Sequence, residues 1–292
     1  LLQPVARKPR IRSLSMKHYV PILKGKLGEY GALKELSADA RVDITPLIEI
    51  PPVPYDFVAD APSKSLGQHI GPVAGQLETY WGTDEPILLD SHLVEDDAYD
   101  SAASVCTDAI ANGVKVVPVV TIDNADGVDA LRNAANENGV CVRIGRKQLD
   151  NEDLGEAIDS ILRIVDTQKE DTDLLFDLGE LKEDQTSIYV MAVLGMVFNI
   201  PTVDEFRSLT LASASFPTDL SEVEGDSIQL VQRRDWGLWK SVSKRNRALP
   251  KALGFGDYAI CHPELVRIDP RIMSPSASIR YTGEENWVIF KA

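Results

Sequence analysis

The chain has 292 residues, of which 44% are hydrophobic and 26% charged, and its formal net charge is −15 at pH 7. This length suits one large domain or two modest ones with a substantial core. The negative charge argues against broad, nonspecific binding to nucleic-acid backbones, and no apolar run reaches the roughly 18 residues that span a membrane. Cys106, Cys141 and Cys261 form neither a disulfide framework nor a CxxC metal motif, which favours a cytoplasmic location.

The amino-terminal residues differ in composition from the remainder. Residues 1–15 contain basic side chains and no acid, and Met16 is followed at once by strand-like sequence. We therefore interpret residues 1–15 as a tag-like or flexible arm, and we expect a single domain over residues 16–292.

Short apolar segments then alternate with helical segments. The run Ile44–Ile50 is typical, because it has the length of a buried strand and prolines close it. The expected strands are 18–24, 44–50, 86–90, 114–121, 140–144, 173–177, 208–213 and 257–261. The expected helices are 29–36, 66–81, 96–112, 125–138, 152–168, 185–198 and a helical stretch over 228–242, and a proline-rich loop is expected over 51–62.

This alternation predicts a parallel sheet covered by helices. Eight strand–helix units in about 275 residues match an α/β fold of the (β/α)8 TIM type. The tail departs from the rhythm, because segments 276–282 and 287–290 predict a C-terminal β-hairpin in place of the last helix. A doubly wound open parallel sheet is the alternative, although no GxGxxG motif follows the first strand.

Functional side chains of such barrels gather where the strands end. Those positions hold three candidate catalytic acids or metal ligands: Glu49, Asp90 and Asp177. With His92 or His262 they could bind Mg²⁺, Mn²⁺ or Zn²⁺ and position a water for attack on a phosphodiester. Alternatively, the acids pair with Lys24 and Arg143 in a buried network or cap the following helices.

Cations at the same end of the barrel suggest an anionic ligand. Lys24, Arg143 and Arg280 would hold the anion, and His262 and Tyr281 complete the expected ligand-binding set. No motif identifies a cofactor or a particular metal, although a divalent metal is compatible with the carboxylates.

Four sequence blocks, 19–33, 44–52, 255–263 and 277–282, resemble the "beta protein" family of bacteria and their phages. The resemblance implies a prokaryotic or phage setting with links to antiviral defence, and it assigns no catalytic residue. It brings together, as candidates for one site, Lys24, Glu49, Asp257, His262, Arg280 and Tyr281.

Two functions follow as hypotheses. In the first, the barrel binds, and in one version hydrolyses, a phosphate-bearing ligand at its carboxyl-terminal mouth. That hypothesis predicts that at least four of six side chains converge there: Lys24, Glu49, Asp90, Arg143, Asp177 and Arg280. In the alternative, the protein is a non-catalytic interaction module that recognises a phage or host protein. The loop 51–62, with Tyr55 and Phe57, and the terminal hairpin would then form the contact surface.

Overall fold

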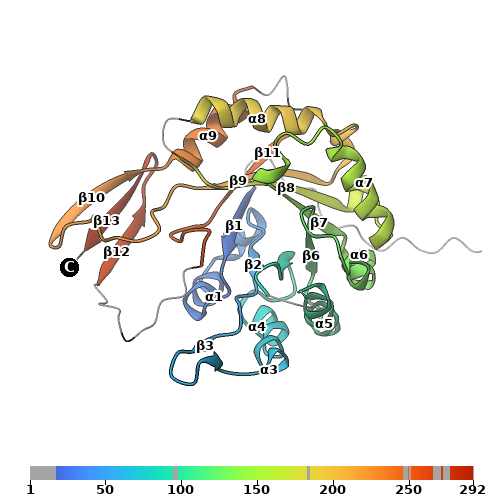
Figure 1. The fold of residues 1–292 in the computed structure, drawn as a ribbon, viewed down its shortest axis with the longest axis horizontal. Coiled ribbons are helices and arrows are strands. Elements are labelled where there is room, and N and C mark those ends of the chain that lie inside the picture. The colour runs from blue at the N-terminus through green and yellow to red at the C-terminus, as the bar shows by residue number, and fades with distance from the viewer. Residues whose placement is uncertain are drawn as a thin grey trace, which may run out of the picture.

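The computed structural model describes residues 18–94, 98–182, 185–245, 249, 251–265, 271 and 277–291. Eight parallel strands close into a barrel in the order β1-β11-β9-β8-β7-β6-β5-β2, with helices around it (Figure 1). The predicted TIM-type barrel is therefore confirmed, and the open sheet is not formed. The expected arm, residues 1–15, lies outside the described residues. The barrel strands are β1 (Tyr19–Leu23), β2 (Leu47–Glu49), β5 (Ile87–Asp90), β6 (Val116–Thr121), β7 (Val140–Gly145), β8 (Thr172–Glu180), β9 (Ser208–Ala214) and β11 (Leu253–Asp257).

The predicted helices appear in the predicted order: most are shorter than expected, the first is shifted by two residues, and a short helix over Ala38–Val42 was not predicted. The expected helix 66–81 is split at Pro72, which has no N–H to continue the hydrogen-bond ladder. Its first half begins where the Ser65 hydroxyl accepts a 3.3 Å hydrogen bond from the Gln68 N–H. The α-helices are α1 (Leu27–Lys34), α2 (Ala38–Val42), α3 (Leu66–Ile70), α4 (Val73–Tyr80), α5 (Ala98–Ala111), α6 (Arg132–Asn138), α7 (Leu154–Val165), α8 (Thr186–Phe198) and α9 (Arg234–Ser243). The 3₁₀ turns are η1 (Val128–Leu131), η2 (Arg146–Gln148), η3 (Lys169–Asp171) and η4 (Val203–Glu205).

None of the helices in the described part of the chain has the length and apolarity needed to cross a membrane.

The eighth barrel strand lies four residues earlier than predicted. Strand β11 spans Leu253–Asp257, and the expected strand 257–261 is instead the loop that leaves it. Two glycines make this strand look unlike a strand in the sequence. A Cβ on Gly256 would lie 2.9 Å from the Cβ of Ala212, so a larger residue at this closing position of the barrel would force its neighbours to shift.

The expected helical stretch 228–242 is partly wrong. Residues 227–232 form strand β10 (Ser227–Gln232), whose alternating exposure shows the period of two that a half-covered strand requires. Only α9 is helical. The predicted terminal hairpin is confirmed as β12 (Ser278–Thr282) and β13 (Asn286–Lys291). Its first expected residues, 276 and 277, precede β12, and residue 276 lies outside the described residues.

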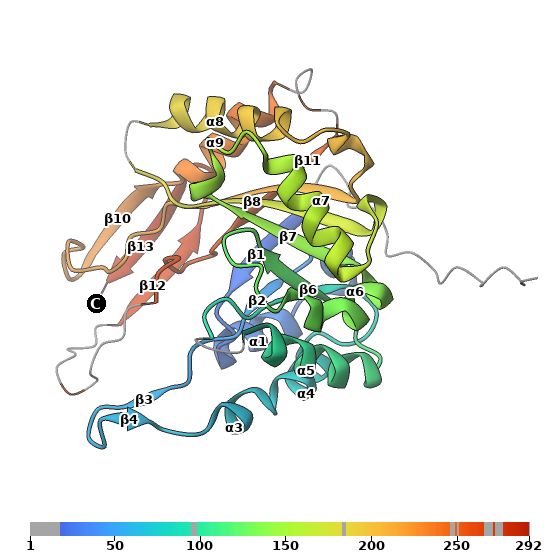
Figure 2. The ribbon, with the colours of Figure 1, turned by 45° about the vertical axis from the view of Figure 1, so that its right-hand side comes forward.

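The hairpin joins β10 in a three-stranded antiparallel sheet of order β10-β13-β12. Figure 1 shows this sheet to one side of the barrel, while α8 and α9 cover β8 and β9. The loop 51–62 also contains a short hairpin, β3 (Tyr55–Asp56) and β4 (Ala61–Pro62), which projects from the barrel (Figure 2).

Alternate strand residues point into the barrel. The interior cluster includes Ile22, Leu47, Leu88, Cys141 and Leu175. Side chains two residues apart on a strand share a face. On each of these strands, the residue two positions further along therefore also faces inward, one layer closer to the carboxyl-terminal mouth. They are Lys24, Glu49, Asp90, Arg143 and Asp177.

Candidate functional site

Strand register places two acids and a lysine side by side. Leu23 pairs with Ile48, so the residues that follow them, Lys24 and Glu49, are neighbours. Glu49 in turn pairs directly with Asp90 on β5. All three side chains are buried, and charged groups removed from water must pair with one another.

Arg143 lies at the centre of this site. Its Nη1 donates to Glu49 Oε1 at 2.8 Å and to Asp90 Oδ2 at 2.6 Å. Its Nε donates to Asp177 Oδ2 at 2.9 Å, and its Nη2 donates to Asp177 Oδ2 at 2.5 Å and to the Tyr258 hydroxyl at 2.6 Å. Nη1 also lies 3.3 Å from His92 Nδ1, so every N–H group of the arginine has a partner. The guanidinium therefore binds carboxylates from three strands at once.

Lys24 closes the network on one side. Its Nζ donates to Glu49 Oε2 and, at 2.6 Å, to the carbonyl oxygen of Pro263, and it lies 5.1 Å from the centre of the Tyr258 ring. Glu49 thus accepts from Lys24 on one oxygen and from Arg143 on the other. The lysine is buried, so its ammonium group depends on these partners.

Tyr258 is the member of the network that sequence reasoning missed. Its hydroxyl donates to Asp177 Oδ2 at 2.6 Å and accepts from Arg143. The predicted strand 257–261 placed this residue inside a strand. With the strand ending at Asp257, Tyr258 is the first residue of the loop at the mouth. Gly254 and Gly256 hid the strand that ends just before Tyr258, and the available signal was the position of this residue within the family-like block 255–263.

His92 is the partly exposed member of the site. Its backbone N–H donates to Asp90 Oδ1 at 2.9 Å, and its Nδ1 lies 3.0 Å from the same oxygen. The other ring nitrogen, Nε2, lies 3.7 Å from Glu49 Oε1, and the side chain is 32% exposed. An imidazole held by a carboxylate on one side and open to solvent on the other can accept a proton.

The charge pattern favours the ionised forms of Asp90, Asp177 and Arg143. Burial opposes ionisation of Asp90, but His92 and then Arg143 outweigh it and lower the pKa of Asp90. Burial also opposes ionisation of Asp177, and Arg143 and Tyr258 lower its pKa in the same way. Burial alone would lower the pKa of Arg143, yet the facing groups raise it well above its ordinary value. Both aspartates are therefore ionised and the arginine is charged at neutral pH.

Three predicted ligand-binding residues lie outside the network. His262 is buried, its Nδ1 accepts from the Glu264 N–H at 3.2 Å, and its Nε2 lies 3.7 Å from Glu180 Oε2. Arg280 donates to the carbonyl of Ile260 at 3.0 Å and stacks on Phe216. Tyr281 is exposed on β12. Five of the six side chains expected to converge do so, and Arg280 does not.

A divalent cation has one plausible set of ligands among the described residues. One ligand atom from each of Glu49, Asp90 and His92 lies within 4.8 Å of the others. Oxygen and imidazole ligands of this kind suit Mg²⁺, Mn²⁺ or Zn²⁺. Asp177, which the sequence also suggested as a ligand, is instead held by Arg143 and Tyr258.

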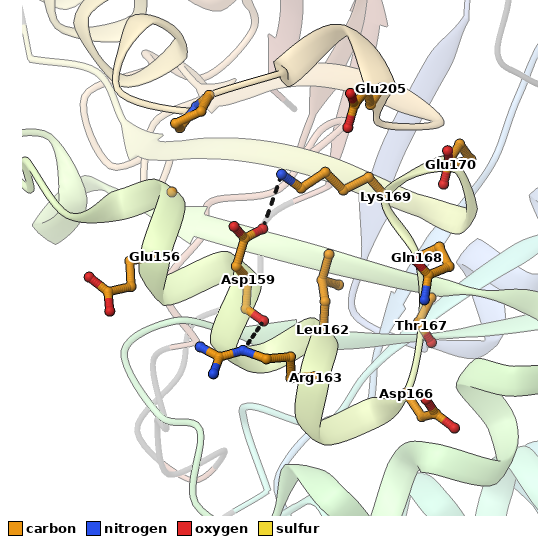
Figure 3. Close-up of a pocket in the computed structure, with 12 residues that line it drawn as sticks. Glu156, Asp159, Leu162, Arg163, Asp166, Thr167, Gln168, Lys169, Glu170 and Glu205 are labelled. Atoms are coloured by element: carbon orange, nitrogen blue, oxygen red, sulfur yellow. Dashed lines mark hydrogen bonds and ion pairs between the residues drawn. The ribbon is translucent and has the colours of Figure 1, made fainter.

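A separate cleft lies on another part of the molecule. It has a volume of about 790 Å³ and is lined by α7, by residues 166–170 and by Pro201 and Glu205. Figure 3 shows its Lys169–Asp159 ion pair of 3.2 Å. Because residues 166–170 and Glu205 lead into β8 and β9, this cleft adjoins the amino-terminal ends of the strands. TIM-type barrels do not place their chemistry at that end.

A closed parallel barrel with a buried acid–arginine network at its carboxyl-terminal mouth defines a protein of the TIM-barrel class. Within that class, the family model described as Beta protein matches residues 19–292. The chain belongs to the Beta protein family, as the four sequence blocks indicated. No curated protein matches the chain.

Proposed function

We propose that this protein binds a phosphate-bearing ligand at the carboxyl-terminal mouth of the barrel, in a phage or phage-defence setting. The observation that supports it best is the convergence of Lys24, Glu49, Asp90, Arg143 and Asp177 on one buried point beside a solvent-facing His92. Charged side chains gathered at such a mouth are typical of sites in this fold.

A basic rim at the mouth would attract the anion. Arg280 reaches the loop that leaves β11, where its Nη1 donates to the Ile260 carbonyl oxygen at 3.0 Å. Burial and Glu29 raise the pKa of the neighbouring Cys261 thiol, and the nearby charges of Lys26, Arg280 and Lys24 oppose that rise. Lys26 and Arg280 are exposed. Arg143, in contrast, has its N–H groups engaged by the acids, so we assign anion binding to Lys26 and Arg280 and an organising role to Arg143.

The chemistry available at this point is proton transfer. His92 Nδ1 lies 3.0 Å from Asp90 Oδ1, and in the tautomer in which Nδ1 donates to this carboxylate, Nε2 is left to take a proton from water. In hydrolysis the water oxygen would form a bond to phosphorus, and the bond from phosphorus to the leaving oxygen would break. The water proton would pass to Nε2, and the leaving oxygen would keep the electron pair and take a proton from solvent.

Binding is tested by calorimetry with matched pairs of compounds, such as AMP with adenosine and ribose 5-phosphate with ribose. We expect only the phosphorylated member of each pair to bind and to raise the melting temperature. The double variant Lys26→Gln/Arg280→Gln should bind at least about tenfold more weakly, because two charge-assisted contacts are lost. Arg163→Gln, an exposed change on α7, is the matched control. Equal affinity of the rim variant and the wild type would refute the proposal.

One observation favours a second candidate, a non-catalytic interaction module. The outer face of the β10-β13-β12 sheet carries two apolar rows across its strands, set by the pairing register. The side chains are largely exposed, and an apolar patch of this kind often marks an interface. The rows are Ile228–Phe290–Ile279 and Leu230–Val288–Tyr281.

A second copy of the chain would present the same two apolar rows. We therefore test the interaction module as a dimer that forms through this face, and recognition of a phage or host protein stays a prediction. Sedimentation velocity should show concentration-dependent dimers that Ile228→Lys/Ile279→Lys abolishes. Val42→Lys, an exposed apolar change on α2, should leave them intact. A wild type that stays monomeric at high concentration would argue against this version.

A further inference from the structure

Strand β10 forms one border of the three-stranded sheet (Figure 1). Within the described part of the chain it pairs with β13 alone, and all six of its residues take part in that pairing. Alternate N–H and C=O groups of an antiparallel strand point away from its partner. The free edge of β10, which faces away from β13, therefore presents a row of backbone donors and acceptors that another strand could use.

This free edge lacks the features that usually prevent strand pairing. Natural edge strands tend to carry charged side chains, prolines or bulges. The sequence of β10 contains no charged residue, proline or glycine, and its register with β13 runs without a bulge. Ile228 is 70% exposed and Leu230 is 61% exposed. An apolar, unprotected edge of this kind is suited to accept an added strand.

A groove runs along the same edge. It has a volume of about 630 Å³, and four consecutive residues of β10, Gln229–Gln232, contribute to its lining. Consecutive residues of a strand point to opposite faces of the sheet, so a groove lined by all four follows the edge and not a single face. Its volume falls in the range of roughly 300–1,000 Å³ that is usual for ligand sites.

A second wall of the groove comes from the β9–β10 loop, residues 215–226. Residues 215–219 and 221–223 of this loop line the groove. Phe216 and Val223 share a small buried cluster with Trp287 and Ile289 of β13, so the loop covers the inner face of the sheet. The groove therefore lies between this loop and the free edge of β10.

The charges of the groove favour a basic ligand. Its lining contains three acids, Glu180, Asp219 and Glu222, and one cation, Arg234. All three acids are exposed. A cleft with an excess of one charge attracts the opposite charge, so lysine or arginine side chains directed toward the loop would find ion-pair partners there.

We propose that the free edge of β10 captures an extended peptide by strand addition, with its basic side chains toward the β9–β10 loop and its apolar side chains on the outer face. Successive side chains of an added strand alternate between the two faces. Those on the outer face would lie beside Ile228 and Leu230 and lengthen the two apolar rows. Those on the inner face would meet Asp219 and Glu222. The partner is therefore a protein segment in which apolar and basic residues alternate.

The test measures fluorescence anisotropy of a labelled, amidated six-residue peptide in which valine alternates with lysine. We expect it to bind more tightly than a peptide of the same composition with its lysines grouped together. Asp219→Asn/Glu222→Gln should weaken binding about three- to tenfold, because two ion pairs are lost. Glu170→Gln/Glu205→Gln is the matched control, since it removes the same charge from the cleft beside α7. These side chains are exposed, so each variant should keep the fold, which circular dichroism checks.

Two N-methylated forms of the alternating peptide test the backbone pairing. Methyl groups on one alternate set of peptide nitrogens block the donors that face β10, whereas methyl groups on the other set face away from it. We therefore expect one methylated form to bind and the other to lose binding. Binding of the unmethylated peptide should also slow hydrogen exchange of β10 amides.

Several results would overturn the proposal. They are the absence of binding at millimolar peptide, equal binding of the two methylated forms, equal binding of the alternating and grouped peptides, and an Asp219→Asn/Glu222→Gln variant that binds as tightly as its control. Slower exchange of β10 amides at higher protein concentration, without peptide, would assign the edge to a second copy of the chain and would also overturn it.

Discussion

The hydroxyl of Tyr19 donates a 2.6 Å hydrogen bond to Asp257 Oδ1 and joins the first barrel strand to the last. Asp257 Oδ2 lies 3.5 Å from Arg233 Nη2, and the same nitrogen lies 3.7 Å from Asp235 Oδ2. Arg233 also contacts the Trp287 ring at 4.8 Å. This second buried network therefore ties the closure of the barrel to the three-stranded sheet, and it gives the protein a pH dependence.

Burial raises the pKa of Asp235 to about 6, against the opposing hydrogen bond from Ser215, and the charge of Asp257 raises it further. The unfolded chain ionises this group near pH 3.9. Between these values the folded state binds the extra proton, so the free energy of unfolding decreases as pH rises from about 4 to 6, by about 3 kcal/mol from this group. Asp235→Asn should remove that slope in urea denaturation at several pH values. Exposed Asp204→Asn should retain it, and an unchanged slope in Asp235→Asn would contradict the assignment.

Arg143→Leu should destabilise the protein by about 3–5 kcal/mol, because it leaves three buried carboxylates without their shared cation. Chemical denaturation at pH 7 measures the effect. The loss should shrink at acidic pH, where the carboxylates become protonated. Arg163→Leu, an exposed change on α7, should alter the free energy of unfolding by no more than about 0.5 kcal/mol. Similar values for the two variants would show that the network contributes nothing.

Tyr258→Phe should cost about 1–3 kcal/mol, since it removes the hydroxyl that bridges Arg143 Nη2 and Asp177 Oδ2. Tyr281→Phe removes the same atom from an exposed side chain and should be neutral. The melting temperatures of the two variants, compared with the wild type, separate a buried hydrogen-bond role from a general effect of losing a hydroxyl.

Gly256→Ala should destabilise the barrel by about 1–3 kcal/mol, because the new methyl group would lie 2.9 Å from the Ala212 Cβ and 3.1 Å from the Val20 carbonyl oxygen. Gly75→Ala, in α4, meets nothing within 4 Å and should stabilise the protein by roughly 0.5–1 kcal/mol through helix propensity. Urea denaturation of both variants should therefore show opposite signs. A neutral Gly256→Ala would mean that β9 and β11 can move apart.

The barrel was predictable because apolar strands and helical segments alternate at regular intervals, and because polar residues follow the strands. Lys24, Glu49, Asp90, Arg143 and Asp177 were identified from that position alone. The sequence did not reveal which alternate set of side chains points inward, since strands covered by helices are apolar on both faces. That choice depends on how the barrel closes.

The errors have local causes. The glycines of β11 hid a strand, so the strand end was placed at Cys261 and His262 was expected at the mouth in place of Tyr258. Strand β10 was taken as helical because Trp236 and Trp239 of the following helix dominate that stretch. Arg280 is in a recognisable sequence block, yet it is on a sheet outside the barrel, and no periodicity in the chain predicts that placement.

The pairing of β1 with β11 also constrains synthesis of the protein. Tyr19 pairs with Phe255, so one edge of β1 has no barrel partner until β11 has been synthesised. Contacts between such distant residues form slowly, and unpaired strand edges are prone to aggregation while they wait. The barrel therefore cannot close before β11 is in place, and the Arg143 network is completed only then, because Tyr258 directly follows that strand.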